Sequence, residues 1–193
     1  SSQVWLMDVR GGEPWPLTRM EKGVRAFAWL DDATLLLVAA EDASLYEQLN
    51  KDRKDTTNVL DDEDHAAPVR LLRFEIKGSK VTRLTTNADR ITSVTVSPDG
   101  AWAVTNHNRS LAETFNQKIK PVTFLHDLKQ GTSTQLFAGQ NLQARNFLFT
   151  RDSKGFYFMA PFNNHAYLLN ASVTRIYYYD LASAAHVQVP LDW

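Results

Sequence analysis

The chain has 193 residues, 44% of them hydrophobic, which is enough to bury a sizeable core. A formal net charge of −1 argues against bulk electrostatic attraction to nucleic acid, and the absence of cysteine excludes disulfides, thiolate metal sites and a cysteine nucleophile. The apolar runs are far shorter than the roughly 18 residues that a membrane-spanning helix needs. We therefore expect no nucleic-acid partner and no membrane partner.

The N-terminal residues predict a strand, a turn and a second strand. The stretch Gln3–Val9 favours a strand, RGGEP (Arg10–Pro14) is rich in turn-forming residues, and WPLT (Trp15–Thr18) resumes extended structure. A strand pair of this kind is expected to be the second half of a larger unit, so residues 1–20 are interpreted as half of a repeat.

A first module, an alternating strand followed by a tight turn, occurs three times without gaps. Its copies are FAWLDDA (Phe27–Ala33), VTVSPDG (Val94–Gly100) and FLFTRDS (Phe147–Ser153). Each turn has an aspartate at its penultimate position, namely Asp32, Asp99 and Asp152. In the second copy, Pro98 presets one turn dihedral and Gly100 allows the loop to close. An apolar strand follows each turn, so each copy predicts a hairpin.

A second module, also a strand, a small-residue turn and a strand, follows each copy of the first. Its copies are Leu71–Thr85, Val122–Phe137 and Thr174–Val189, and the N-terminal QVWLMDVRGGEPWPLT is a fourth copy without a preceding first module. The unit is therefore four antiparallel strands joined by tight turns, which is the pattern of β-propeller blades. A plain β-sandwich is the alternative, but it gives no reason for matched modules.

We thus predict an all-β fold: a partial β-propeller of three four-stranded antiparallel blades (21–87, 88–140 and 141–193) plus the preceding half blade. The excess residues of each blade fall between its second and third strands and should emerge on one face. These insertions are Glu41–Pro68, Asn106–Lys120 and Pro161–Ser172. Because open blades expose strand edges, self-association is also expected.

The segment DTTNVLDDEDHAAPVRLLRFEIKGSKVTRLT (Asp55–Thr85), with the SPDG turn, resembles the propeller of prolyl oligopeptidase family serine peptidases. The likeness is greatest to acylaminoacyl-peptidase and dipeptidyl-peptidase-like members. In that family the propeller precedes an α/β-hydrolase domain and restricts which peptides reach its serine. The resemblance implies a gating or substrate-orienting role, a peptide substrate, an α/β-hydrolase domain of the same parent chain as partner, no cofactor, and a bacterial periplasmic location.

No catalytic residue is assigned within the chain. A Gly-x-Ser-x-Gly elbow does not occur, and the five histidines have no serine in a strained turn to serve. If the parent protein is a peptidase, its nucleophile is expected beyond Trp193. Two other functions stay open: a Tol-type interaction propeller without a hydrolase, and, ranked last, a propeller hydrolase with carboxylates in its central channel.

Two residues are candidates for substrate binding. In dipeptidyl peptidases of the resembled family, a glutamate pair in a propeller helix holds the substrate amine. DASLYEQ (Asp42–Gln48) matches that pattern only at Tyr46 and Glu47, so Glu47 is the candidate there. Arg109, at the start of the second insertion, could bind a carboxylate, although it could equally brace its own loop.

The first insertion is strongly acidic, which suggests attraction of a peptide amine, docking on a basic surface, or a solvated loop. Its segment DDEDH (Asp61–His65) lacks the spacing of a calcium loop and has one imidazole, so no metal is expected. The tyrosines of IYYYD (Ile176–Asp180) are expected to pack within a blade.

Overall fold

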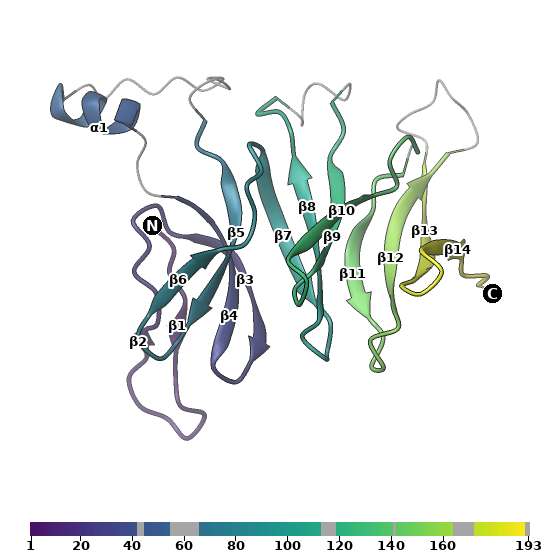
Figure 1. Ribbon diagram of the computed structural model, residues 1–193, viewed down its shortest axis with the longest axis horizontal. Coiled ribbons are helices and arrows are strands. Elements are labelled where there is room, and N and C mark those ends of the chain that lie inside the picture. The colour runs from purple at the N-terminus through teal and green to yellow at the C-terminus, as the bar shows by residue number, and fades with distance from the viewer. Residues whose placement is uncertain (42–44, 55–65, 113–118, 141, 164–171, 192–193) are drawn as a thin grey trace. The chain divides into compact units, whose positions relative to one another are not determined.

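The computed structural model describes residues 1–41, 45–54, 66–112, 119–140, 142–163 and 172–191 (Figure 1). The chain forms two compact units, which are described separately. The first consists of Ser1–Val94 and His107–Lys120, and the second of Thr95–Asn106 and Pro121–Trp193.

The first unit begins with a two-stranded sheet and continues with an antiparallel meander of four strands. Strand β1 (Trp5–Leu6) pairs with β2 (Trp15–Pro16). The meander runs in the order β3, β4, β5, β6, with the short helix α1 (Leu45–Asp52) between β4 and β5. Its strands are β3 (Val24–Asp31), β4 (Thr34–Ala40), β5 (Val69–Glu75) and β6 (Lys80–Arg83).

The core of the first unit gathers on the central strand β4, whose residues from Leu35 to Ala40 are all buried. A strand buried on both faces gives a continuous apolar run instead of an alternating one. One face of β4 packs with β5 and with residues that lead into β1 and β3. That cluster consists of Val4, Val24, Leu35, Leu37, Ala39, Leu72 and Phe74.

The next four strands are hydrogen-bonded in the order β7, β8, β9, β10, and the division between the units crosses β7 and β8. Their bounds are β7 (Arg90–Val96), β8 (Trp102–Asn108), β9 (Val122–Asp127) and β10 (Thr132–Leu136). Within the first unit, β5 and β7 also form one parallel bridge, between Val69 and Arg90.

The last four strands form an antiparallel sheet in the second unit, in the order β11, β12, β13, β14. They are β11 (Arg145–Phe149), β12 (Gly155–Phe162), β13 (Val173–Asp180) and β14 (Ala185–Gln188). Tyr179 stacks on Phe156 with ring centroids 5.0 Å apart, and Tyr177 stacks on Phe158 at 5.3 Å. The packing role predicted for the IYYYD tyrosines is therefore confirmed for Tyr177 and Tyr179.

These sheets confirm the predicted fold class, an all-β partial β-propeller: after the two-stranded sheet come an eight-stranded sheet, whose strands β3–β6 and β7–β10 form two sets of four, and a four-stranded one. The long connections fall where the sequence predicted them, between β4 and β5, β8 and β9, and β12 and β13. The blade boundaries at residues 87 and 140, and the self-association of exposed edges, stay predictions.

The SPDG turn is held by its serine and aspartate side chains. The Ala101 N–H donates to Asp99 Oδ1 at 3.0 Å, the Trp102 N–H donates to Ser97 Oγ at 2.9 Å, and Gly100 has a positive φ of 67°. A residue with a side chain adopts that φ only at a cost, which explains the glycine.

The matching turn between β11 and β12 repeats this arrangement. Asp152 Oδ1 accepts from the Lys154 N–H at 3.2 Å, Thr150 Oγ1 accepts from the Gly155 N–H at 3.3 Å, and Ser153 takes the positive φ, at 56°. The alignment of these two turns is therefore confirmed.

The equivalent aspartate between β3 and β4 is Asp31, and the prediction of Asp32 was wrong by one residue. The Asp31 carboxylate accepts from the Ala33 N–H at 2.8 Å, the same two-residue step as in the other turns. Asp31 also pairs directly with Thr34, so this loop is shorter, and the β3–β4 register shifts between Trp29 and Asp31. An irregularity of that kind displaces the turn by one position without changing the apolar pattern.

Candidate functional site

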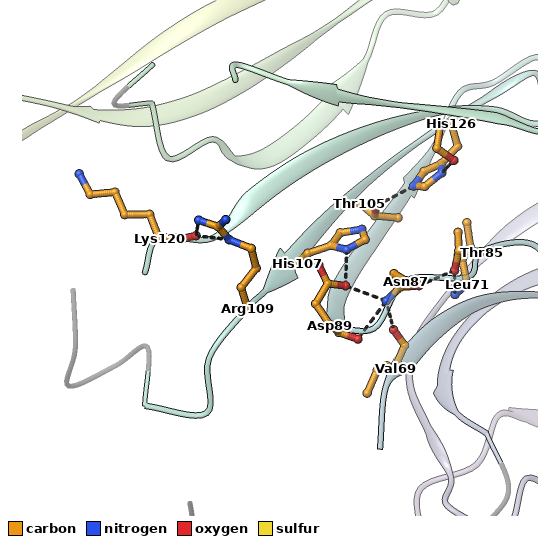
Figure 2. Close-up of polar contacts among 11 residues, drawn as sticks. Val69, Leu71, Thr85, Asn87, Asp89, Thr105, His107, Arg109, Lys120 and His126 are labelled. Carbon is orange, nitrogen blue, oxygen red and sulfur yellow. Dashed lines mark hydrogen bonds and ion pairs between the residues drawn. The ribbon is translucent and has the colours of Figure 1, made fainter. Parts of the chain in front are cut away.

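The best-defined polar cluster of the first unit joins the residue before β7 to the end of β8. There, His107 Nδ1 donates to Asp89 Oδ1 at 2.8 Å (Figure 2), because an ionised carboxylate can only accept. The Asn87 amide donates to the same oxygen at 2.7 Å. His107 is 2% exposed, whereas the Asp89 side chain is 20% exposed. The result is a buried imidazole whose orientation is set by a partly exposed carboxylate.

The pKa of the Asp89 carboxyl lies below its usual value. Burial raises this pKa, but the hydrogen bond from His107, the positive charge of His107 and the Asn87 amide together lower it by more. Each of these contacts favours the ionised carboxylate.

A chain of hydrogen bonds continues from Asn87 to the backbone of β5, as Figure 2 shows. Asn87 Nδ2 donates to the Val69 carbonyl at 3.0 Å, and Thr85 Oγ1 donates to Asn87 Oδ1 at 2.7 Å. Thr85 Oγ1 in turn accepts from the Leu71 N–H at 3.0 Å. This network ties the approach to β7 to the middle strand of the preceding sheet.

The Asp89–His107 pair resembles the acid–histidine half of a hydrolytic triad, but its imidazole is not placed for catalysis. A general base must come within hydrogen-bond reach of the proton that it removes. His107 is almost fully buried, so a bound substrate would not reach its ring. The pair is therefore a structural contact that positions the start of the second insertion.

A second buried histidine lies in the second unit and is also structural. His126 is 4% exposed, with Nε2 2.7 Å from Thr105 Oγ1 and Nδ1 2.7 Å from Ser133 Oγ. Both ring nitrogens are thus satisfied by hydroxyl groups.

Arg109, the candidate for carboxylate binding, braces the second insertion. Its Nε and Nη2 both donate to the Lys120 carbonyl, at 3.2 and 3.1 Å, so that its guanidinium links the two ends of this insertion (Figure 2). Substrate binding by Arg109 stays a prediction, and it would require this guanidinium to divide its donors between Lys120 and the ligand.

Arg109 also borders a small pocket of about 60 Å³ within the first unit. Arg90 lines it too, and donates from Nη2 to the Ser110 carbonyl at 3.1 Å. The full lining consists of Ala66, Ala88, Asp89, Arg90, Asn108, Arg109, Ser110 and Leu111. Since Ala66 closes the first insertion and Asn108–Leu111 open the second, these two insertions meet at this pocket.

Glu47, the candidate for amine binding, lies on α1, which confirms a helix in this insertion. Its carboxylate forms an ion pair with Lys22, whose side chain is 20% exposed. Glu47, on α1, pairs with Lys22 of the β2–β3 connection, whereas Arg109 bonds to Lys120, so the two candidates contact different residues. Binding of a substrate amine by Glu47 stays a prediction, and the amine would have to compete with Lys22.

The DDEDH segment, considered as a metal site, lies outside the described residues, as do most acids of the first insertion. Among the residues that are described, no group of three or more histidine, aspartate and glutamate side chains could hold a metal ion. Nor does that part of the chain contain a helix long and apolar enough to cross a bilayer.

The sequence analysis missed the network of Asn87, Asp89 and His107. The signal was the polar run TTNAD (Thr85–Asp89), which begins at the threonine of the Leu-Thr pair that ends the preceding module. Side chains of this kind often bond to nearby backbone groups. The partner on β8 lies 18 residues away and could not be assigned from that local pattern.

Comparison with known proteins shows the fold. No protein-family model matches the chain, and no curated protein matches it significantly. Among solved structures, tricorn protease is similar with a TM-score of 0.66 and 13% identity, over 98% of this chain and 15% of that one. The fold is that of a β-propeller.

Two TolB structures show the same fold. TolB from Acinetobacter baumannii has a TM-score of 0.59 at 14% identity, over 96% of this chain and 37% of that one. A putative TolB from Agrobacterium tumefaciens has a TM-score of 0.58 at 12% identity, over 96% of this chain and 55% of that one. The chain thus spans little more than half, or less, of each of these structures.

Proposed function

We propose that this chain is a non-catalytic β-propeller segment of a serine peptidase of the prolyl oligopeptidase type. In this proposal the propeller gates or orients peptide substrates for an α/β-hydrolase domain elsewhere in the parent protein. The observation that carries the proposal is the likeness to tricorn protease over 98% of the chain. Fold likeness alone does not transfer an activity, so the role must be tested at the insertions.

The meeting of two insertions at one pocket supports a substrate-facing role for them. The pocket combines the guanidinium groups of Arg90 and Arg109 with the carboxylate of Asp89. Paired arginines suit the carboxylate of a peptide because the planar guanidinium can donate two parallel hydrogen bonds. The neighbouring Asp89–His107 contact would hold this loop in a fixed position while the peptide passes.

The test uses the full-length protein that contains this chain, treated with a serine-directed fluorophosphonate probe. We expect the probe to label one serine outside residues 1–193, and peptide hydrolysis to disappear with labelling. A labelled serine within residues 1–193, or no labelled serine anywhere, would contradict the proposal.

A variant pair tests the role of the insertion. Arg109→Ala should raise KM for peptides severalfold while the labelling rate stays unchanged, because the change removes binding without altering the nucleophile. Arg151→Ala, at an exposed arginine of the β11–β12 turn, is the matched control and should leave KM unchanged. If the two variants change KM equally, Arg109 does not bind the substrate.

The second candidate function is a TolB-type interaction propeller with no hydrolase attached. The two TolB structures, each similar over 96% of this chain, favour it. A full-length protein that labels no serine but binds a partner protein through the insertions would select this function.

A further inference from the structure

A pocket of the first unit has a volume of about 600 Å³ and shares no lining residue with the insertion pocket. Pockets of about 300–1,000 Å³ are the size that takes small ligands. Six residues line it: Arg19, Met20, Glu41, Leu72, Val81 and Arg83. We call it the arginine pocket. Its walls come from the β2–β3 connection, the residue after β4, and strands β5 and β6.

The polar wall of the arginine pocket carries more positive than negative charge. Glu41 forms an ion pair with Arg83 Nε and lies 3.5 Å from Arg70 Nη1. One carboxylate therefore serves two guanidinium groups. Arg70 is only 15% exposed, and its Nε is buried without a hydrogen-bond partner in the described structure. A buried donor without a partner is costly, which favours an additional anion nearby.

Arg19 adds a third guanidinium at the rim. It is exposed, and it makes no hydrogen bond or ion pair among the residues described. Among the residues that line the pocket, two arginines, Arg19 and Arg83, stand against one glutamate, Glu41, so the described wall has a surplus of one positive charge. A carboxylate matches the planar donors of arginine better than a compact ion does.

The remaining wall is apolar. Leu72 is 3% exposed and belongs to the core of the unit, while Val81, on the outer strand β6, is 43% exposed. Met20 packs against the same core from the β2–β3 connection. Leu72 pairs with Arg83 across β5 and β6, so an apolar wall and a cationic group stand side by side. A ligand that contacts both the arginine and the apolar wall must carry an anionic group and an apolar group.

We propose that the arginine pocket binds a carboxylate carried on a branched apolar body, such as the C-terminal leucine or valine of a peptide. The carboxylate bonds to Arg19 and Arg83, and the side chain packs on Met20, Leu72 and Val81. This proposal does not rest on the peptidase function, since an interaction propeller would use the same pocket to hold the C-terminus of a partner.

The test is calorimetric titration of the full chain with N-acetyl-leucine and with N-acetyl-leucine amide. We expect saturable binding of the acid, about tenfold weaker binding of the amide, and weakening of acid binding by added salt. A parallel titration with 4-methylpentanoate separates the two sources of such a carboxylate. Binding equal to that of N-acetyl-leucine indicates a free aliphatic acid, and weaker binding indicates a peptide. Equal binding of acid and amide, or binding of neither, overturns the proposal.

The test variants lie at exposed positions, so that the substitutions change ligand binding without disturbing the fold. Arg19→Gln should weaken acid binding roughly threefold to tenfold, whereas Arg10→Gln, which removes the same charge from the exposed β1–β2 turn, should not change it. Val81→Lys should tighten acid binding and Val81→Glu should weaken it, because the charge of the wall changes in opposite directions. Similar loss from both Val81 variants would mean that the pocket is only apolar, which contradicts the proposal.

Discussion

Two blade junctions of the first unit share one hydrogen-bond motif, but the motif is linked to different residues at each junction. In both, a buried threonine accepts from a backbone N–H 14 residues earlier at 3.0 Å: Thr18 from Val4 and Thr85 from Leu71. Thr18 then donates to the Gln3 amide at 2.8 Å, and Thr85 to the Asn87 amide at 2.7 Å. The half blade therefore repeats the full blade at the level of single atoms.

The difference lies beyond the amide. At the first junction, Gln3 closes the network on the Met20 backbone, with contacts of 2.7 and 3.0 Å. At the second junction, Asn87 donates a hydrogen bond to Asp89, which also accepts one from the buried His107. The threonine contact is thus common to these two junctions, whereas the charged extension occurs only at the second of them, the one that carries the second insertion. Four predictions test this distinction.

The largest effect is expected from Asp89→Ala. The substitution leaves the buried His107 ring and the Asn87 amide without their shared acceptor, so the free energy of unfolding should fall by about 2–4 kcal/mol. The measurement is urea unfolding followed by tryptophan fluorescence. Asp8→Ala, at an exposed carboxylate paired with Arg10, is the control and should leave the free energy of unfolding nearly unchanged. A loss as small as in the control would show that the charged extension does not stabilise the junction.

The second prediction compares the two threonines through isosteric changes. Thr85→Val and Thr18→Val each leave a buried backbone N–H unpaired, at a cost of about 1–3 kcal/mol. Thr85→Val should cost more, because Asn87 Oδ1 loses its hydrogen bond, whereas Gln3 Oε1 keeps the one from the Met20 N–H. Urea unfolding of both variants measures the difference. A larger loss at Thr18 would contradict the stronger coupling assigned to the second junction.

The repeat could be predicted because its signals are local. Alternating strands, turn aspartates and the blade-ending Leu-Thr each lie within a few residues, and the predicted strands are those observed. The one turn assigned a residue too late, Asp32 for Asp31, depends on a register shift in the neighbouring pair of strands. Such a shift leaves no mark on the apolar pattern.

The sites were harder to predict because they join distant segments. Asp89 meets His107 only through the folding of β7 against β8, and the arginine pocket collects residues from four separate stretches of the chain. Arg109 was singled out from sequence, with the bracing of its own loop as the alternative, and the structure supplies that brace at Lys120. The partner of Glu47, Lys22, lies 25 residues earlier and was not anticipated.

The third prediction concerns pH. The pKa of Asp89 is lower in the folded chain than in the unfolded one, so its ionised form stabilises the fold above the unfolded pKa of about 3.9. This contribution is lost as the pH falls through the lower, folded pKa. The difference in unfolding free energy between the natural chain and Asp89→Asn should therefore shrink as the pH falls below about 4. Unfolding in urea at several pH values measures it, and a difference independent of pH would contradict the ionised contact.

The smallest effect is expected from Gln3→Ala at the first junction. The change removes an amide that accepts from Thr18 and from the Met20 N–H, but Gln3 is itself only partly buried, so water can replace the lost partner. The free energy of unfolding should fall by about 0.5 kcal/mol, against about 1–2 kcal/mol for the matched Asn87→Ala. Both are measured by urea unfolding under the same conditions. Equal losses would mean that the two amides stabilise the fold equally. The contacts of Asn87 with Asp89, and through Asp89 with His107, would then add no stability beyond the threonine contact that both junctions share.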